Sequence, residues 1–299
     1  MHKPAALRSG DLIGVVAPGA AVDEAEVHAG ARVLERAGYR VLIGASVLKQ
    51  KGYLAGSDAD RLADLVDMFT DAKVRAIVAA RGGYGSGRLL PQFDPAIASQ
   101  HAKIFVGYSD LTFLLTQLVQ RAALVAFHGP MLAGLDKNPD GAAALLGLLS
   151  GDRAGWNLSA QTIIQPGTAE GVIVGGCLSI LVAGLGTPYA LETAGRLLFI
   201  EDVNEKPYRI DRMLTQLRQA GKLDAVAGVI FGEMAGCVSG PDEAVGVRDV
   251  IRDAFAAARF PVVFGLSSGH GSGTTTLPLG VRARLAGDRL SLLESPVAE

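Results

Sequence analysis

Three polar residues that lie where strands are expected to end have the side chains needed for nucleophilic acyl transfer: Ser109, Glu201 and His270. A serine hydroxyl is a weak nucleophile, so it needs a base to take its proton. A histidine can be that base, and a carboxylate beside it fixes the histidine tautomer and stabilises the imidazolium. These residue types therefore indicate chemistry at a carbonyl carbon, provided that the fold brings them together.

Ser109 follows the apolar run IFVG at residues 104–107 and directly precedes the helical pattern LTFLL. Serine is a preferred cap at the start of a helix, and this role would be a sufficient explanation. A strand that turns straight into a helix also exposes a side chain at the sheet edge and aims backbone N–H groups at an oxyanion. The complete G-x-S-x-G motif is absent because Leu111 stands at its second glycine. Both interpretations of Ser109, as a helix cap and as a nucleophile, therefore remain open.

The histidine that could act as the base is best sought in loops, where functional residues concentrate. His270 lies in GLSSGHGSGTTT, a loop of small residues in which packing requires no imidazole. His128 ends an expected strand in FHGPML and is a rival. His2 in the tail, His28 on an expected helix and His101 in a polar stretch are interpreted as structural or solvated.

Three acidic residues compete for the role of the carboxylate: Glu201, Asp202 and Glu205, just past the expected strand RLLFI. Their spacing does not distinguish among them. Acidic residues are also common in the first turn of a helix, where they meet its positive end. From the residues alone, the choice of acid stays open.

A glycine-rich turn, RGGYGSG at residues 81–87, follows the expected strand VRAIVAA directly. Its glycines leave backbone N–H groups unobstructed, which suits either a phosphate or an oxyanion. Neither complete nucleotide-binding motif is present. An alternative from another class is therefore a nonhydrolytic module that binds a phosphate ligand, in which Ser109 only caps a helix.

Composition excludes several kinds of partner and cofactor. The net charge is −2 without long charged runs, so no surface for nucleic acid or anionic lipid is expected. Cys177 and Cys237 lie far apart without CxxC spacing, and no HExxH occurs, so neither a disulfide framework nor a metal site is expected. The N-terminus lacks the apolar core of a signal peptide. We expect a cytoplasmic protein without a cofactor.

Residues 171–191 carry no charge and are long enough to cross a bilayer as a helix. Five glycines and Pro188 make this stretch a poor continuous helix. We therefore expect a buried strand, turn and helix there, and no membrane partner.

Short apolar runs alternate with helical patterns over the first part of the chain, which is typical of βαβ units and a parallel sheet. Residues 1–135 are expected to form an α/β domain that carries Ser109. Residues 136–170, rich in Gly, Ser, Pro and Asn, are expected to be a linker or crossover. Residues 171–299 are expected to form a second α/β domain that ends in a hairpin around Gly287.

Several ordered segments resemble the LD-carboxypeptidases, in particular the murein tetrapeptide carboxypeptidases, over nearly the whole chain. These segments are GDLIGVVAPG, RGGYGSGRLL, GYSDLTFLL, FHGPML, GGCLSILVAGLGTPY, LFIEDVNEKPYRIDRMLTQLRQAGKL, GVIFGE and FPVVFGLSSGHG. The resemblance implies a flavodoxin-like N-terminal domain with a parallel sheet and a smaller C-terminal α/β domain. One departure is Cys177, where the family commonly has asparagine; it is not expected to be catalytic.

The resemblance also implies a catalytic triad of Ser109, Glu201 and His270, assembled across the interface of the two domains. It implies an oxyanion hole made by the backbone N–H groups of Asp110 and of Gly83, in preference to Gly82. By the same resemblance, Glu201 is preferred to Asp202 and Glu205 as the acid, and His128 becomes structural.

The function implied by the resemblance is a serine carboxypeptidase that releases the terminal D-alanine of murein tetrapeptide, at the L,D bond after meso-diaminopimelate, during cell-wall recycling. A cytoplasmic homodimer without a cofactor is implied as well. An alternative within the class is a microcin-immunity-type peptidase that hydrolyses a peptidyl or aminoacyl nucleotide. In that case Trp156, the single tryptophan, could stack on the base; a role in the core or at a hinge is the alternative for this residue.

Overall fold

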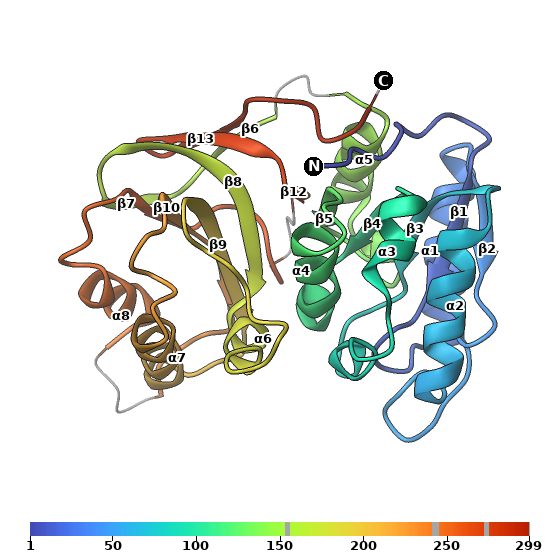
Figure 1. Cartoon of the computed structure of the whole chain (residues 1–299), viewed down its shortest axis with the longest axis horizontal. Helices are drawn as coiled ribbons and strands as arrows, with labels where there is room; N and C mark the ends of the chain where they lie inside the picture. Colours follow the sequence, from blue (N-terminus) through green and yellow to red (C-terminus); the bar gives the residue numbers. More distant parts are fainter. Residues whose placement is uncertain (153–155, 241–244, 272–274, 299) are drawn as a thin grey trace. The chain divides into compact units, whose positions relative to one another are not determined.

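The computed structural model of the protein describes residues 1–152, 156–240, 245–271 and 275–298. The chain forms two compact units, each with its own β-sheet (Figure 1). The first unit consists of Met1–Arg153, Thr275–Gly280 and Ser295–Glu299, and the second of Ala154–Thr274 and Val281–Glu294. The chain therefore returns to the first unit after building most of the second.

The first unit contains a six-stranded sheet in the order β12-β5-β4-β3-β1-β2. Its strands are β1 (Leu12–Val16), β2 (Arg40–Ile43), β3 (Val74–Ala79), β4 (Ile104–Gly107), β5 (Ala126–His128) and β12 (Leu277–Leu279). Strands β1 to β5 pair in parallel, whereas β12 pairs with β5 in the antiparallel direction. The order β2-β1-β3-β4-β5 is that of flavodoxin-like folds, so the predicted fold class is confirmed.

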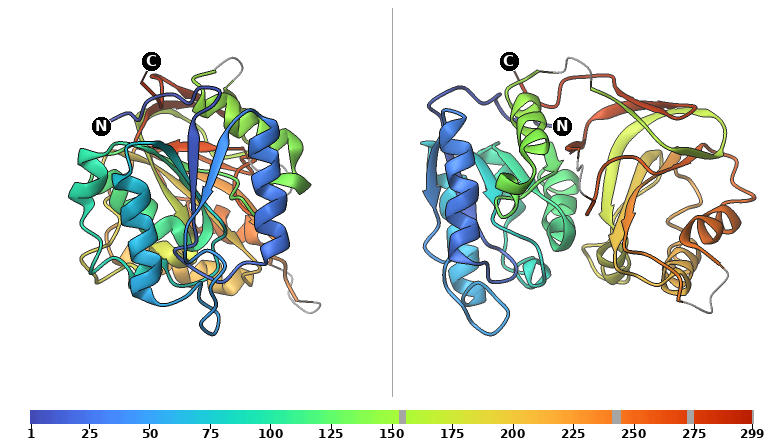
Figure 2. Two further views of the ribbon diagram at one scale, coloured as in Figure 1. Left: turned by 90° about the vertical axis from the view of Figure 1, so that its right-hand side faces the viewer. Right: turned by 180° about the vertical axis from the view of Figure 1, so that it is seen from behind.

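Helices pack against this sheet, and α1 and α2 lie on opposite sides of β1 and β2 (Figure 2). The helices of the unit are α1 (Glu24–Arg36), α2 (Asp58–Thr70), η1 (Ser86–Arg88), α3 (Pro95–Gln100), η2 (Ser109–Leu111), α4 (Thr112–Gln120), η3 (Leu135–Lys137) and α5 (Pro139–Leu149). Helix α2 starts at a capping box, in which Ser57 and Asp60 satisfy each other's backbone N–H groups. With helices on both sides, β4 is buried along its whole length.

The second unit contains an eight-stranded mixed sheet in the order β6-β14-β13-β8-β9-β10-β11-β7. Its strands are β6 (Asn157–Ser159), β7 (Thr162–Gln165), β8 (Thr168–Cys177), β9 (Arg196–Val203), β10 (Gly228–Ala235), β11 (Val262–Phe264), β13 (Arg282–Ala286) and β14 (Arg289–Leu292). Strands β8 to β11 are parallel and the others pair antiparallel. The expected hairpin around Gly287 is formed by β13 and β14.

Within its described residues, the second unit also contains the helices α6 (Leu178–Ala183), α7 (Pro207–Gln219) and α8 (Val247–Ala254). The uncharged residues 171–191 form most of β8 and all of α6, as the sequence predicted. In the described part of the chain, no helix is long and apolar enough to cross a membrane. The segment expected to connect two domains, residues 136–170, contains α5, β6 and β7, and the two strands extend the second sheet.

Candidate active site

Ser109 lies at the carboxyl end of β4 with a φ of +64°, a left-handed backbone conformation that non-glycine residues rarely adopt. Its side chain caps neither following helix, because the N-cap residues of η2 and α4 are Tyr108 and Leu111, without side-chain capping bonds. The helix-cap interpretation is therefore wrong. A strained turn between a strand and a helix is instead the geometry of a nucleophile elbow.

The glycine-rich turn after β3 lies directly against Ser109. A Cβ atom built on Gly82 would lie 2.9 Å from the Ser109 Cβ and 3.1 Å from its Oγ. Gly83 has a φ of +89°, and a Cβ atom there would lie 2.4 Å from the Cβ of Ala20. The Gly82 carbonyl accepts a hydrogen bond from the Ala20 N–H at 3.0 Å. Only glycines allow this close approach of backbone to the serine.

Asp110 connects the turn that carries Ser109 to the glycine-rich turn. Its buried carboxylate accepts a hydrogen bond from the Ser86 N–H at 2.8 Å, and its carbonyl accepts one from the Ser86 hydroxyl at 2.7 Å. Burial raises the pKa of Asp110, while the hydrogen bonds from residues 85 and 86 oppose that shift. The two turns are thus fixed to each other by side-chain and backbone bonds.

Glu201 and His270 lie together in the second unit. Glu201 is on β9 and is fully buried, and its Oε2 lies 2.6 Å from Nδ1 of His270. The imidazole is 14% exposed and lies in the loop after β11. When Nδ1 donates its hydrogen to the carboxylate, Nε2 is the nitrogen that can accept a proton. This arrangement suits a general base held in one tautomer.

The two rival acids have other contacts. Asp202 accepts hydrogen bonds from the backbone N–H groups of Ser179 and Val203, both at 2.8 Å, and burial raises its pKa. Glu205 forms an ion pair with Arg209 at 3.5 Å, one turn along α7. Asp202 therefore accepts a hydrogen bond from the first turn of α6, and Glu205 pairs with a residue in the first turn of α7.

Two other side chains considered in the sequence, those of His128 and Cys177, are buried. His128 lies on β5, and its ring meets that of Tyr108 edge to face at 5.6 Å between centroids. Burial and the neighbouring carboxylates raise the pKa of Cys177, so its thiol stays neutral. Within the described ranges, no group of three or more His, Cys, Asp or Glu side chains could hold a metal ion.

Glu233 is a site residue that the sequence interpretation did not single out. It lies on β10, and its Oε2 accepts a hydrogen bond from the Gly271 N–H at 2.9 Å. Its own N–H donates to the Ser268 carbonyl at 2.9 Å, so Glu233 binds the loop on both sides of His270. Its position in the sequence could have identified it as a candidate. Like Glu201, it follows an apolar run that predicts a strand, in the segment GVIFGE.

Partial burial raises the pKa of Glu233, and nearby Glu201 raises it further, while the hydrogen bond from the Gly271 N–H and the charge of His270 oppose the shift. A carboxyl group with a raised folded-state pKa contributes stability at low pH and loses it as the pH rises through that value. We therefore expect Glu233→Gln to become more stable relative to the wild type as the pH rises above the ordinary value of 4.5. Urea unfolding at about pH 4 and about pH 7 measures this difference.

Asp60 provides a control of the opposite sign. Its pKa is lowered by hydrogen bonds from Lys49 and Ser57, so its contribution to stability is lost as the pH falls. Asp60→Asn is expected to lose stability relative to the wild type at both pH values, and the loss should shrink only as the pH falls below the ordinary value of 3.8. A stability difference for Glu233→Gln that stays constant with pH would contradict the assigned environment of Glu233.

Two family models match the chain: the LD-carboxypeptidase N-terminal domain over residues 13–129, and the LD-carboxypeptidase C-terminal domain over residues 170–285. This chain belongs to the LD-carboxypeptidase family. The two matched ranges contain Ser109 in the first and Glu201 and His270 in the second. The family resemblance predicted from the sequence is thus confirmed.

Relatives of this LD-carboxypeptidase include the probable murein peptide carboxypeptidase of Bacillus subtilis, 41% identical over 100% of this chain and 96% of the relative. The murein tetrapeptide carboxypeptidase of Pseudomonas aeruginosa is 31% identical over 93% of this chain and 94% of its own. These relatives support a peptidase as the class of activity.

Two solved structures share the fold of this LD-carboxypeptidase. The muramoyltetrapeptide carboxypeptidase of Oxalobacter formigenes has a TM-score of 0.83 at 28% identity, covering 93% of this chain and 97% of that chain. A mutant of the microcin C7 self-immunity protein MccF, in complex with adenosine monophosphate, has a TM-score of 0.90 at 22% identity, and the match covers 100% of both chains. At that identity, the second likeness concerns the fold alone.

Proposed function

We propose that this protein is a serine LD-carboxypeptidase that releases the terminal D-alanine of murein tetrapeptide. The observation that carries the proposal is the contact between the buried Glu201 carboxylate and Nδ1 of His270. It supports an activated serine mechanism, and the strained turn at Ser109 supports that residue as the nucleophile. The relatives named as murein peptide and murein tetrapeptide carboxypeptidases support murein tetrapeptide as the substrate.

In the acylation step, the Ser109 hydroxyl attacks the carbonyl carbon between the L-centre of meso-diaminopimelate and D-alanine. Nε2 of His270 takes the serine proton, and Glu201 stabilises the imidazolium. The same proton then passes to the leaving amine, so the C–N bond breaks and D-alanine departs.

The tetrahedral oxyanion is held by the backbone N–H groups of Asp110 and Gly83. Such donors are each worth about 2.7–4 kcal/mol in related acyl transfer. Water, deprotonated by His270, then attacks the acyl-enzyme and releases the shortened peptide. The chemistry needs no metal or organic cofactor, and we propose that the enzyme works as a cytoplasmic homodimer.

Gly83→Ala is expected to lower kcat for D-alanine release by about 10- to 100-fold, because the new Cβ displaces the donor from the oxyanion. The added atom would lie 2.4 Å from the Ala20 Cβ. Gly134→Ala is the matched control: its φ of +102° imposes similar backbone strain, but nothing lies within 4 Å of the new atom. Steady-state kinetics and melting temperatures of both variants separate the effect of displacing the N–H donor from the effect of backbone strain. Equal kcat values in the two variants would exclude Gly83 from the oxyanion hole.

The alternative substrate class is an acyl nucleotide, because MccF shares the fold and has been solved in complex with aspartyl sulfamoyl adenosine. The test is D-alanine release from L-Ala-γ-D-Glu-meso-diaminopimelyl-D-Ala, with and without an equal concentration of that compound. We expect release that this nucleotide analogue does not inhibit, and no cleavage of a peptide ending in L-alanine. Strong inhibition by the analogue, or cleavage of the analogue alone, would favour the acyl-nucleotide substrate. Tight nucleotide binding with no hydrolysis of either compound would favour a binding module.

A further inference from the structure

Arg61, in the first turn of α2, has a side chain that is fully buried in the first unit. Burying a cation is costly, so stability alone does not account for an arginine at this position. Its Nη2 donates a hydrogen bond to Asp58 Oδ1 at 2.6 Å. Arg88 also binds Asp58, at 2.8 Å from its Nη2. Asp58 would therefore keep a cationic partner if Arg61 were replaced.

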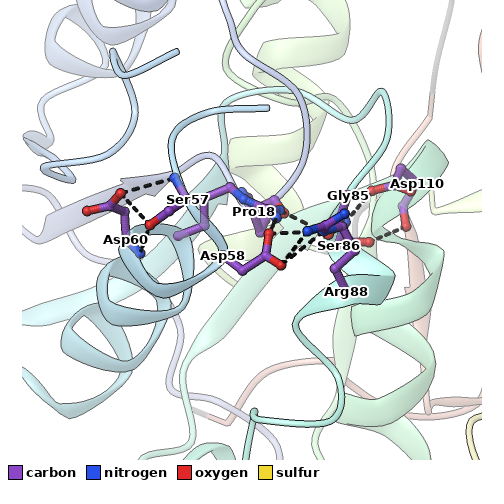
Figure 3. A network of polar contacts seen from close by, with 9 residues as sticks. Pro18, Ser57, Asp58, Asp60, Gly85, Ser86, Arg88 and Asp110 are labelled. Atoms are coloured by element: carbon purple, nitrogen blue, oxygen red, sulfur yellow. Dashed lines mark hydrogen bonds and ion pairs between the residues drawn. The ribbon is translucent and has the colours of Figure 1, made fainter. Parts of the chain in front are cut away.

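The other terminal nitrogen of Arg61, Nη1, donates to two backbone carbonyls, those of Pro18 and Gly85. The bond to Gly85 is 2.9 Å long. Figure 3 shows Pro18, Asp58 and Gly85 close together in this network, with Asp110 beyond them. Pro18 follows β1, and Gly85 lies in the glycine-rich turn after β3. One guanidinium thus fixes the two loops at the point where the strand order reverses, which is where ligands bind in such sheets.

From these two loops, short chains of hydrogen bonds lead to the nucleophile. Ser86, the residue after the second carbonyl, donates both its N–H and its hydroxyl to Asp110, the neighbour of Ser109. In the other loop, the Ala20 N–H donates to the carbonyl of Gly82, which lies against Ser109. The position of the glycine-rich turn relative to the serine therefore depends on bonds that begin at Arg61.

We propose that Arg61 is a positioning residue, which holds the glycine-rich turn so that the backbone N–H of Gly83 lies where the oxyanion forms beside Ser109. The inference rests on the function proposed above. Arg61 acts through the two carbonyls and does not touch the reacting atoms. Because an oxyanion hole binds the transition state more strongly than the substrate, displaced donors lower kcat and leave KM nearly unchanged.

Two variants and one control isolate this role. Arg61→Met keeps much of the volume but removes the donors, and Arg61→Lys keeps the charge without the planar fork that reaches several acceptors. Lys103→Met is the matched control. Lys103 is also a buried cation of this unit, and its Nζ donates to the backbone carbonyls of Met68 and Asp71. It lies just before β4, at the opposite end of that strand from Ser109.

The experiment measures kcat and KM for D-alanine release, together with amide hydrogen exchange of the peptide that covers residues 82–88. For Arg61→Met we expect kcat to fall by about 10- to 100-fold, KM to stay within about twofold, and exchange in residues 82–86 to rise. For Arg61→Lys we expect smaller changes in the same direction. For Lys103→Met we expect a lower melting temperature, with kcat and exchange in this turn close to those of the wild type.

Unchanged exchange in residues 82–86 of both Arg61 variants, or unchanged kcat despite faster exchange, would overturn the positioning role. An equal loss of kcat in Lys103→Met would overturn it too, because the effect would then be a general loss of stability. A wild-type protein that releases no D-alanine would overturn the proposed function instead. The exchange measurement needs no substrate, so it would still decide whether Arg61 holds the turn; should Arg61→Met fail to fold, Arg61→Lys decides it.

Discussion

Ser109→Ala is expected to lower kcat for D-alanine release by at least about 10⁴-fold, because the acyl-enzyme cannot form without the hydroxyl. The remaining activity over the uncatalysed reaction would come from the oxyanion donors and substrate binding. Substrate binding itself should change little, since the hydroxyl contributes mainly to the bond that forms. Rapid-quench kinetics, with D-alanine detected by mass spectrometry, measures the loss.

Ser109→Gly provides a second readout that a merely structural serine would not produce. With a φ of +64°, Ser109 occupies a conformation that glycine adopts without strain. The glycine variant should therefore be as inactive as the alanine variant, yet more stable than it by about 1 kcal/mol. Retained D-alanine release in either variant would show that another residue is the nucleophile.

Glu201→Gln is expected to lower kcat by about 10³- to 10⁴-fold with little change in KM, because the amide no longer selects the productive tautomer of His270 or stabilises its charged form. The carboxylate is fully buried and lies 2.6 Å from Nδ1, so no solvent can replace it. The pH dependence of kcat/KM, which reports the ionisation of the free enzyme, should change as well.

Asp202→Asn is the matched control for this change, since it alters the neighbouring buried carboxylate by the same single group. Asp202 accepts hydrogen bonds from the backbone N–H groups of Ser179 and Val203, so its substitution should destabilise the start of α6 while kcat falls far less. A loss of kcat in Asp202→Asn that equals or exceeds the loss in Glu201→Gln would contradict the assignment of the acid.

The elements that depend on local pattern could be predicted from the sequence. Apolar runs separated by amphipathic segments indicated the parallel sheet, and small residues around His270 indicated a loop. Glycines and Pro188 in residues 171–191 correctly argued against a membrane helix and for a strand followed by a helix. Each of these features depends on residues close together in the chain.

Features that depend on residues far apart in the chain could not be predicted from local sequence patterns. Strands β6 and β7 are short, and β7 is placed by pairing with β11, about 100 residues further along the chain. Arg61 looks like an ordinary helix residue until the fold brings two carbonyls to it. Between Glu201, Asp202 and Glu205, family resemblance favoured the first, and the contact with His270 supports that choice.

The most direct test of the central claim is incubation of the wild-type protein with L-Ala-γ-D-Glu-meso-diaminopimelyl-D-Ala, followed by mass spectrometry of the products. The account predicts free D-alanine and the corresponding tripeptide in equal amounts, formed catalytically by the wild type and absent with Ser109→Ala. Intact tetrapeptide after long incubation with the folded wild-type protein would contradict it.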